Sequence, residues 1–156
     1  MTRSRISSTR NLYIDIGSGY NPKPGYKTAD ITGFPNLDYV IKDSRIYSAT
    51  GELEENSVDG FRLRNVIHHV KDLDRLFTNL FRYLNHTGEI EIIECSKEHY
   101  YSNFCLDNLW YRYVISRPEI WFSRKYRNYI EIAEKIGFRV SSKKSVGEKE
   151  IIKLVK

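Results

Sequence analysis

The chain has 156 residues, of which 40% are hydrophobic and 29% charged, with a net charge of +5. This composition excludes disorder over the whole length, and the length corresponds to one domain of roughly 150 residues. We therefore predict a single domain over residues 1–156. No apolar run reaches the roughly 20 residues of a membrane span, and the basic start of the chain lacks the apolar region of a secretory signal. Cys95 and Cys105 match neither a disulfide framework nor a metal-ligand spacing, so we expect a cytoplasmic protein without a metal.

The first part of the chain predicts short strands separated by turns. Residues 12–16 form an apolar run that stops at Gly17-Ser18-Gly19, which indicates a buried strand ending in a glycine turn. Further strands are predicted over residues 26–31, 37–42 and 58–64. A parallel crossover usually takes a dozen or more residues and a helix. Because the first two connections are shorter than this, we expect reduced or missing helices between strands 1 and 2 and between strands 2 and 3.

The second part predicts helices alternating with strands. Apolar residues recur at spacings of three and four from Leu73 to Leu84, which predicts a helix over 71–84. A turn at 85–88 and a strand over 89–94 follow. A second stripe, from Tyr126 to Ile136, predicts a helix that stops at Gly137 and leads to strands over 138–142 and 151–155. Together these elements predict an α/β fold with a mostly parallel, seven-stranded sheet.

Polar residues and glycines follow four of the predicted strands. They are Asp15, Gly17, Ser18, Gly19, Asp30, Asp43, Ser44 and Asn65. Ligands of open α/β sheets bind outside the carboxyl ends of the strands, where glycines let the backbone approach a ligand closely. Asp30 is placed to accept hydrogen bonds from ribose hydroxyls, and Asp43 is placed near a purine edge.

This ordered set of strand ends resembles the class I S-adenosylmethionine-dependent methyltransferases, from Leu12 to Val155. Asp15-x-Gly17-x-Gly19 is similar to motif I of that family. The resemblance implies a Rossmann-like sheet and S-adenosyl-L-methionine as cofactor, with Gly17 and Gly19 against its methionine and ribose parts. It also implies that Asp30 binds the ribose and Asp43 the adenine amine. The short spacing resembles a compact sub-group of predicted methyltransferases, and residues 61–66 and 92–97 are similar to quinone-biosynthesis methyltransferases.

A nicotinamide-dependent enzyme is disfavoured, because prolines occupy the place of the third glycine that its pyrophosphate needs. The candidate general bases for methyl transfer are His68 and His69, since histidine can take a proton at neutral pH. The alternative is that these histidines cap or pack the next helix. Glu94 and His99, after the fifth strand, are rival polar groups at the same edge.

The charge and the aromatic residues are concentrated in the second half. Residues 97–144 carry 10 basic and 5 acidic side chains, and 10 of the 21 aromatic residues lie between His99 and Tyr129. Such a segment is typical of nucleic-acid or anionic-substrate binding, and also of a solvated helix whose rings fill the core. Tyr100, Tyr101, Trp110 and Trp121 are the candidate stacking residues.

Three functions remain open on the sequence. The first is a minimal methyltransferase acting on a small-molecule oxygen, such as that of a sugar. The second is a methyltransferase acting on RNA or DNA, and the third is a non-catalytic cofactor-binding or partner-activating subunit, suggested by the missing helices. Residues 96–128 are expected to form a lid over the substrate. The sheet face bared by the missing helices is expected to be covered by residues 99–129 or by a second copy of the chain.

Overall fold

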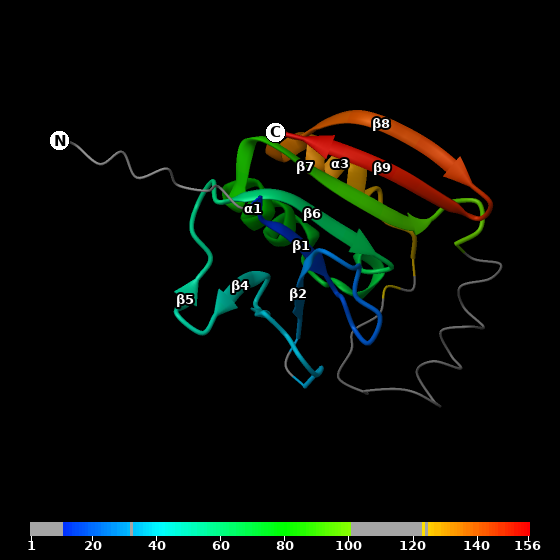
Figure 1. The fold of residues 1–156 in the computed structure, drawn as a ribbon. Helices are drawn as coiled ribbons and strands as arrows, with labels where there is room; N and C mark the ends of the chain where they lie inside the picture. The colour runs from blue at the N-terminus through cyan, green and yellow to red at the C-terminus, as the bar shows by residue number, and fades with distance from the viewer. Residues whose placement is uncertain (1–10, 32, 101–122, 124) are drawn as a thin grey trace.

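The computed structural model describes residues 11–31, 33–100, 123 and 125–156, which build one mixed sheet with helices against it (Figure 1). Most of the expected lid, residues 101–122 and 124, lies outside the described residues, as do Tyr101, Cys105, Trp110 and Trp121. The elements are β1 (Tyr13–Ile16), β2 (Lys27–Asp30), β3 (Tyr39–Lys42), β4 (Arg45–Ser48), β5 (Gly51–Glu52), β6 (Val58–Arg64), the 3-10 helix η1 (Ile67–His69), α1 (Leu73–Tyr83), β7 (Leu84–Cys95), α3 (Tyr129–Ile136), β8 (Arg139–Val146) and β9 (Lys149–Val155).

Within the described residues the sheet has nine strands in the order β5-β4-β3-β2-β1-β6-β7-β9-β8. The pairs β1/β2, β2/β3, β1/β6 and β6/β7 are parallel, and the other four pairs are antiparallel. All seven predicted strands are present. The prediction of a seven-stranded, mostly parallel sheet is nevertheless wrong in strand number and in direction, because β4 and β5 extend the sheet beyond β3 as antiparallel strands.

The two additional strands begin at a hairpin that the sequence signals only weakly. Asp43 and Ser44 join β3 to β4 with φ angles of +51° and +60°, and Lys42 pairs with Arg45 across the turn. Two consecutive residues with positive φ are typical of a type I′ turn, in which Asn-Gly or Asp-Gly is the usual pair. Because Ser44 stands where the glycine is usual, the sequence predicts the end of the third strand there and does not predict the strand that returns.

The core lies between one face of the sheet and the helices α1 and α3, which Figure 1 shows on the same side. α1 begins after Asp72, whose side chain accepts a hydrogen bond from the N–H of Arg75 at 2.9 Å. α3 ends at Gly137, where φ is +125°, a conformation that favours glycine. Phe138 then packs edge-on against Phe81 of α1, with ring centroids 5.0 Å apart. Both predicted helices are confirmed, each slightly shorter than its apolar stripe.

The predicted turn at residues 85–88 is instead part of β7, which begins at Leu84 directly after the last residue of α1. The pairing of β6 with β7 shifts register between Val58 and Gly60. Asn85 donates to Asp59 Oδ1 at 2.7 Å and accepts from the N–H of Thr87 at 3.0 Å. Residues with turn chemistry therefore build an irregularity within the strand.

The opposite face of the sheet has no helix in the described residues, and charged side chains cross it. Asp15 on β1, Arg62 on β6, Glu91 on β7 and Lys153 on β9 are neighbours in register. Arg62 lies 3.3 Å from Asp15 Oδ1 and 3.5 Å from Glu91 Oε2. Neighbouring strands thus present opposite charges to one another, which stabilises this part of the face.

The connection between β1 and β2 lies over this face where a helix was expected to be reduced. Tyr26 packs on Tyr13 with ring centroids 5.4 Å apart. Lys23 lies 4.5 Å from the Tyr26 ring centroid and 3.8 Å from Glu91 Oε2. The loop over 17–26 therefore supplies part of the cover that we expected from residues 99–129 or from a second copy of the chain. A second copy stays a prediction.

Candidate cofactor and catalytic site

β1 ends in a glycine turn that lies against the chain after β6. Gly17 has a φ of +66°, and its N–H donates to the carbonyl of Ala29 on β2 at 2.8 Å. A Cβ on Gly17 would lie 2.4 Å from Val66 Cγ2, far inside the roughly 3.5–4.0 Å at which carbon atoms pack. Glycine at this position therefore lets the turn and the segment after β6 meet at one edge of the sheet.

Asp30, the last residue of β2, closes this turn. Its Oδ2 accepts from the N–H of Gly19 at 2.7 Å, and its Oδ1 accepts from the N–H of Ile31 at 2.7 Å. Among the described residues, a Cβ on Gly19 would meet only the carbonyl oxygen of Gly17, at 4.0 Å. The turn and the buried carboxylate thus form one unit, with open space beside Gly19.

Ser18, between the two glycines, gives an independent indication of a ligand. Its hydroxyl is buried and has no hydrogen-bond partner among the described residues. A buried polar group without a partner costs free energy, so a turn of this kind fits a bound molecule that completes its hydrogen bonds. The residues at this edge therefore fit a nucleoside cofactor.

Asp15 of the predicted motif points to the opposite face of the sheet, on which the described residues place no helix. Its buried carboxylate accepts from the N–H of Lys23 at 2.8 Å and pairs with Arg62. These contacts hold the loop after the glycine turn on the sheet. Direct binding of a cofactor by Asp15 stays a prediction.

Asp43, Ser44 and Asn65 lie at the carboxyl ends of β3 and β6. Asp43 and Ser44 form the hairpin turn, and the Ser44 carbonyl accepts from Asn79 of α1 at 2.9 Å. Asn65 has a φ of +56°, and its side-chain oxygen accepts from Lys149 of β9 at 3.1 Å. The structure places all three at the edge expected for them, and their roles in binding stay predictions.

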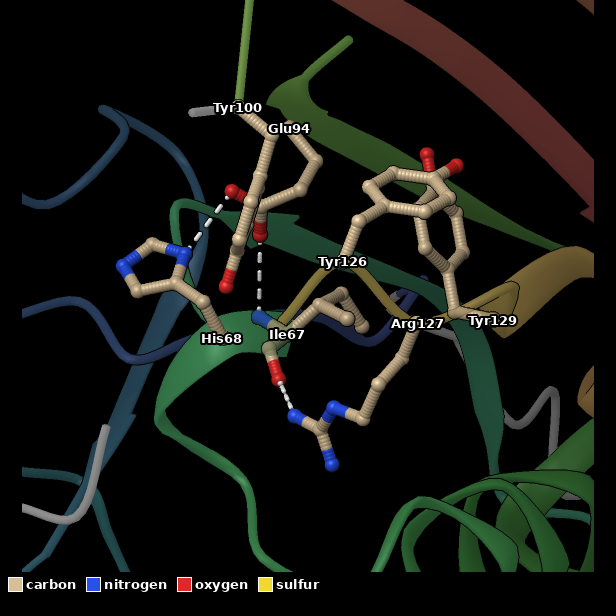
Figure 2. A pocket seen from close by; sticks show the side chains of 7 residues that line it. All are labelled: Ile67, His68, Glu94, Tyr100, Tyr126, Arg127 and Tyr129. Carbon is tan, nitrogen blue, oxygen red and sulfur yellow. Dashed lines mark hydrogen bonds and ion pairs between the residues drawn. The ribbon is translucent and has the colours of Figure 1, made fainter. Parts of the chain in front are cut away.

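His68 and His69 form the end of η1, two and three residues beyond Val66. The buried His68 ring places Nδ1 2.8 Å from Glu94 Oε1 at the end of β7. Glu94 Oε2 accepts from the N–H of Ile67 at 3.0 Å (Figure 2). His68, one of the predicted bases, thus pairs with Glu94, the polar group that was the alternative to it. His99, the other alternative, instead lies with Nδ1 2.7 Å from Ser96 Oγ. The catalytic roles of His68 and His69 stay predictions.

A small cavity lies beside this pair (Figure 2). It is lined by Ile67, His68, Glu94, Tyr100, Tyr126, Arg127 and Tyr129. Arg127 donates to the carbonyl of Ile67, and burial lowers the pKa of its guanidinium. The Tyr129 hydroxyl is buried without a partner among the described residues, and burial raises its pKa. The cavity is therefore bordered by residues of η1, of the end of β7 and the segment after it, and of the start of α3 and the segment before it.

Sequence reasoning did not associate Arg127 or Tyr129 with His68. Tyr129 belonged to the buried stripe of the predicted helix, and the sequence around Arg127 carries no signal for a contact with η1. The N–H of Ser123 also donates to the carbonyl of His68 at 2.8 Å. These contacts link positions more than 50 residues apart, so only the folded chain reveals them.

In the part of the chain that the structure describes, no group of three or more His, Cys, Asp or Glu residues could hold a metal ion. No helix there is long and apolar enough to cross a membrane.

Comparison with solved structures identifies the fold. The chain is similar to an S-adenosylmethionine-dependent methyltransferase from Mesorhizobium loti, with a TM-score of 0.64, 10% identity, and 93% of this chain and 90% of that one covered. A similar enzyme from Aquifex aeolicus has a TM-score of 0.59 and 16% identity, covering 94% and 82%. The trans-methyltransferase CalH, in complex with S-adenosylhomocysteine, has a TM-score of 0.61 and 15% identity, covering 94% and 51%.

No protein-family model and no curated protein sequence matches the chain. The structural matches cover nearly the full length of the chain at low sequence identity, and so they establish its fold and not its activity. The chain has the fold of the class I S-adenosylmethionine-dependent methyltransferases.

Proposed function

We propose that the chain is an S-adenosylmethionine-dependent methyltransferase that binds its cofactor at the carboxyl ends of β1 and β2. The observation that carries this proposal is the glycine turn closed by Asp30, with open space beside Gly19 and a buried, unpartnered Ser18 hydroxyl among the described residues. This turn stands on a fold that methyltransferases share, at the edge where open α/β sheets bind ligands.

In this proposal, different residues at this edge of the sheet contact different parts of the cofactor. The Asp30 carboxylate accepts hydrogen bonds from the ribose hydroxyls, and the backbone of Gly17 and Gly19 faces the ribose and methionine parts. The hairpin turn of Asp43 and Ser44 borders the adenine. S-adenosylmethionine, when bound, supplies a methyl group on a sulfonium, which an acceptor atom attacks in line. The protein's contribution is to bind and align the two reactants, which can supply much of the rate.

The acceptor that we favour is an oxygen of a small molecule, such as a sugar hydroxyl. Support comes from the buried His68–Glu94 pair, two residues along the chain from Val66, which approaches Gly17, since a hydroxyl of high pKa needs a base when it is methylated. A nucleic-acid acceptor is the second candidate, favoured by the exposed edge strand β8 with Arg139, Lys143 and Lys144. The two candidates differ in salt dependence, because binding through phosphate contacts weakens steeply as salt rises.

Calorimetric titration with S-adenosylhomocysteine tests the cofactor site. We expect binding by the wild-type chain and a loss of about 1–3 kcal/mol in Asp30→Asn, the cost of removing a charged hydrogen-bond partner. Asn keeps one acceptor oxygen, which serves the N–H of Gly19 in the turn, while the N–H of Ile31 loses its carboxylate partner. Asp72→Asn is the matched control, because asparagine caps α1 as well as aspartate does and lies away from the turn.

Absence of binding by the folded wild-type chain would contradict the proposal and would favour a non-catalytic subunit. Equal affinity in Asp30→Asn and in Asp72→Asn would show that the cofactor does not bind at the end of β2. A circular dichroism spectrum of each variant establishes that it is folded.

A further inference from the structure

We propose that the edge strand β8 binds an acidic, extended segment of a partner protein, which joins the sheet as a further strand. Exposed sheet edges bind peptides in this way, through backbone hydrogen bonds for affinity and side chains for specificity. The observations that point to it are the length, the exposure and the charge of β8. The inference does not depend on the proposed function, because β6, β7 and β9 separate β8 from the glycine turn after β1.

β8 is the last strand of the sheet in the part of the chain that the structure describes (Figure 1). It pairs with β9 from Arg139, opposite Val155, to Val146, opposite Lys149, with one shift of register. Alternate residues of a strand direct their backbone N–H and C=O groups to opposite sides, so about half of these groups in β8 point away from β9. Seven of the eight residues of the strand are exposed. β8 therefore presents a row of backbone groups with which another strand can pair.

The two edges of the sheet differ in how well they suit an added strand. β5, at the other edge, has only two residues, and a very short edge strand is one way in which proteins prevent pairing with other chains. β8 has eight residues, and it carries two exposed apolar side chains, Val140 at 37% and Val146 at 60%. Its length and its apolar side chains make β8 the edge that fits a partner strand.

The side chains of β8 give this edge a positive charge. Arg139, Lys143 and Lys144 lie in the strand, which contains no acidic residue. Lys143 forms an ion pair with Glu150 of β9 at 3.1 Å. Arg139 and Lys144 form no ion pair with another described residue. Two cations of this strand are thus available to a partner.

These two cations lie on the same face of the sheet. Arg139 is opposite Val155, and Lys144 is opposite Ile151. Both β9 residues are two positions from Lys153, so their side chains share its face, because side chains alternate between faces along a strand. An added strand would place its own side chains beside Arg139 and Lys144 on that face. Opposite charges stabilise such cross-strand pairs, so the edge favours an acidic strand.

A second copy of β8 does not supply this charge. Lysine on an edge strand prevents pairing with like strands, and two β8 strands have no opposite charges to offer each other in any register, because the strand contains no acid. With an acidic strand the same side chains attract, so the charge that excludes a copy of the chain selects a different partner.

A nucleic acid would also meet the cations of β8. It has no strand backbone, however, and so it cannot form a ladder of hydrogen bonds with the outward N–H and C=O groups of β8. The charge and the backbone of β8 are therefore satisfied together by an acidic peptide and only in part by a phosphate chain.

Fluorescence anisotropy with labelled eight-residue peptides, as long as β8, tests the inference. The probe alternates glutamate with valine, so that it is acidic and has a high strand propensity. One control peptide alternates glutamate with proline, which keeps the charge but removes N–H groups that a ladder needs. The other alternates lysine with valine. We expect the wild-type chain to bind the glutamate–valine peptide about 10-fold or more tightly than either control.

Charge reversal in β8 tests the side chains. Arg139→Glu combined with Lys144→Glu should weaken binding of the glutamate–valine peptide by about 10-fold or more and should strengthen binding of the lysine–valine peptide. Lys42→Glu combined with Arg75→Glu is the matched control, because both residues are exposed and lie on β3 and α1. This control changes the net charge equally and should change either affinity by less than about 2-fold.

Amide hydrogen exchange locates the bound peptide. We expect the glutamate–valine peptide to slow exchange in β8, because the outward N–H groups of that strand become bonded, and to leave exchange in β5 unchanged. A circular dichroism spectrum of each variant establishes that it is folded.

Each of the other outcomes overturns the inference. Absence of binding by the glutamate–valine peptide, equal binding by the glutamate–proline peptide, or binding without protection of β8 would show that no acidic strand adds to this edge. Tighter binding of a single-stranded RNA of mixed sequence would assign the cations to a nucleic acid. Self-association of the wild-type chain that the β8 charge reversal abolishes would assign the edge to a second copy. None of these results depends on the binding of S-adenosylhomocysteine, so they are distinct from a failure of the proposed function.

Discussion

Gly17 and Val66 approach so closely that a single methyl group does not fit between them. The Cβ of an alanine at position 17 would lie 2.4 Å from Val66 Cγ2. This contact brings the end of β1 to the segment after β6, and so joins the proposed cofactor turn to the helix that carries His68. The glycine serves the packing of the site as well as any approach of a ligand.

We expect Gly17→Ala to lower the free energy of unfolding by about 3 kcal/mol, because overpacking adds to the cost of a side chain at positive φ. Urea unfolding measures this loss. Gly25→Ala is the matched control, since Gly25 has a φ of +83° but no atom of the described residues lies within 4 Å of its added Cβ; it should lose only about 1 kcal/mol. Val66→Ala should restore part of the stability of Gly17→Ala. Equal losses in the two glycine variants would contradict the steric explanation.

Arg62 neutralises the buried carboxylate of Asp15. The side chains are 11% and 3% exposed, so Arg62→Met leaves a charge without its partner in a buried site. We expect this variant to lose about 3–5 kcal/mol of unfolding free energy, and Asp15→Asn added to it to recover part of that loss. Lys153→Met removes a pair that is much more exposed and should cost less than about 1 kcal/mol. If both variants cost the same, the row of charges contributes no more than a surface pair.

Tyr129 has a buried hydroxyl without a partner in the described residues. We expect Tyr129→Phe to leave the free energy of unfolding at neutral pH unchanged or to raise it by about 1 kcal/mol, because it removes an unsatisfied polar group. Burial raises the pKa of this hydroxyl in the folded state. The unfolded chain therefore ionises this hydroxyl more easily than the folded chain does. The free energy of unfolding is unaffected by this difference below the ordinary tyrosine pKa of about 10 and falls as the pH rises above it.

The pH dependence provides the measurement. Unfolding of the wild type should become easier above about pH 10, and Tyr129→Phe should show less of this alkaline loss. Tyr20→Phe is the control, because Tyr20 is 67% exposed and should change neither quantity. A large loss of stability in Tyr129→Phe at neutral pH would indicate a bound water or another partner for the hydroxyl.

The local patterns of the sequence predicted the elements that depend on neighbours along the chain. The stripe from Leu73 predicted α1, because residues three and four apart share one helix face. The short connections after β1 and β2 predicted the missing helices, because chain length alone limits a crossover. Asp43 and Ser44 misled the prediction, since their hairpin turn lacks the usual glycine.

The sequence by itself determined seven of the nine described strands and both helices in their order, the glycine turn and the polar residues at strand ends, because these follow from periodicity and from the conformational limits of glycine and proline. Only the tertiary structure decided that Glu94 faces His68, that Asp15 faces Arg62, and that Val66 needs Gly17. Each of these pairs joins residues 26 or more positions apart. Contacts of this kind depend on the register of neighbouring strands and on which face of the sheet a side chain occupies.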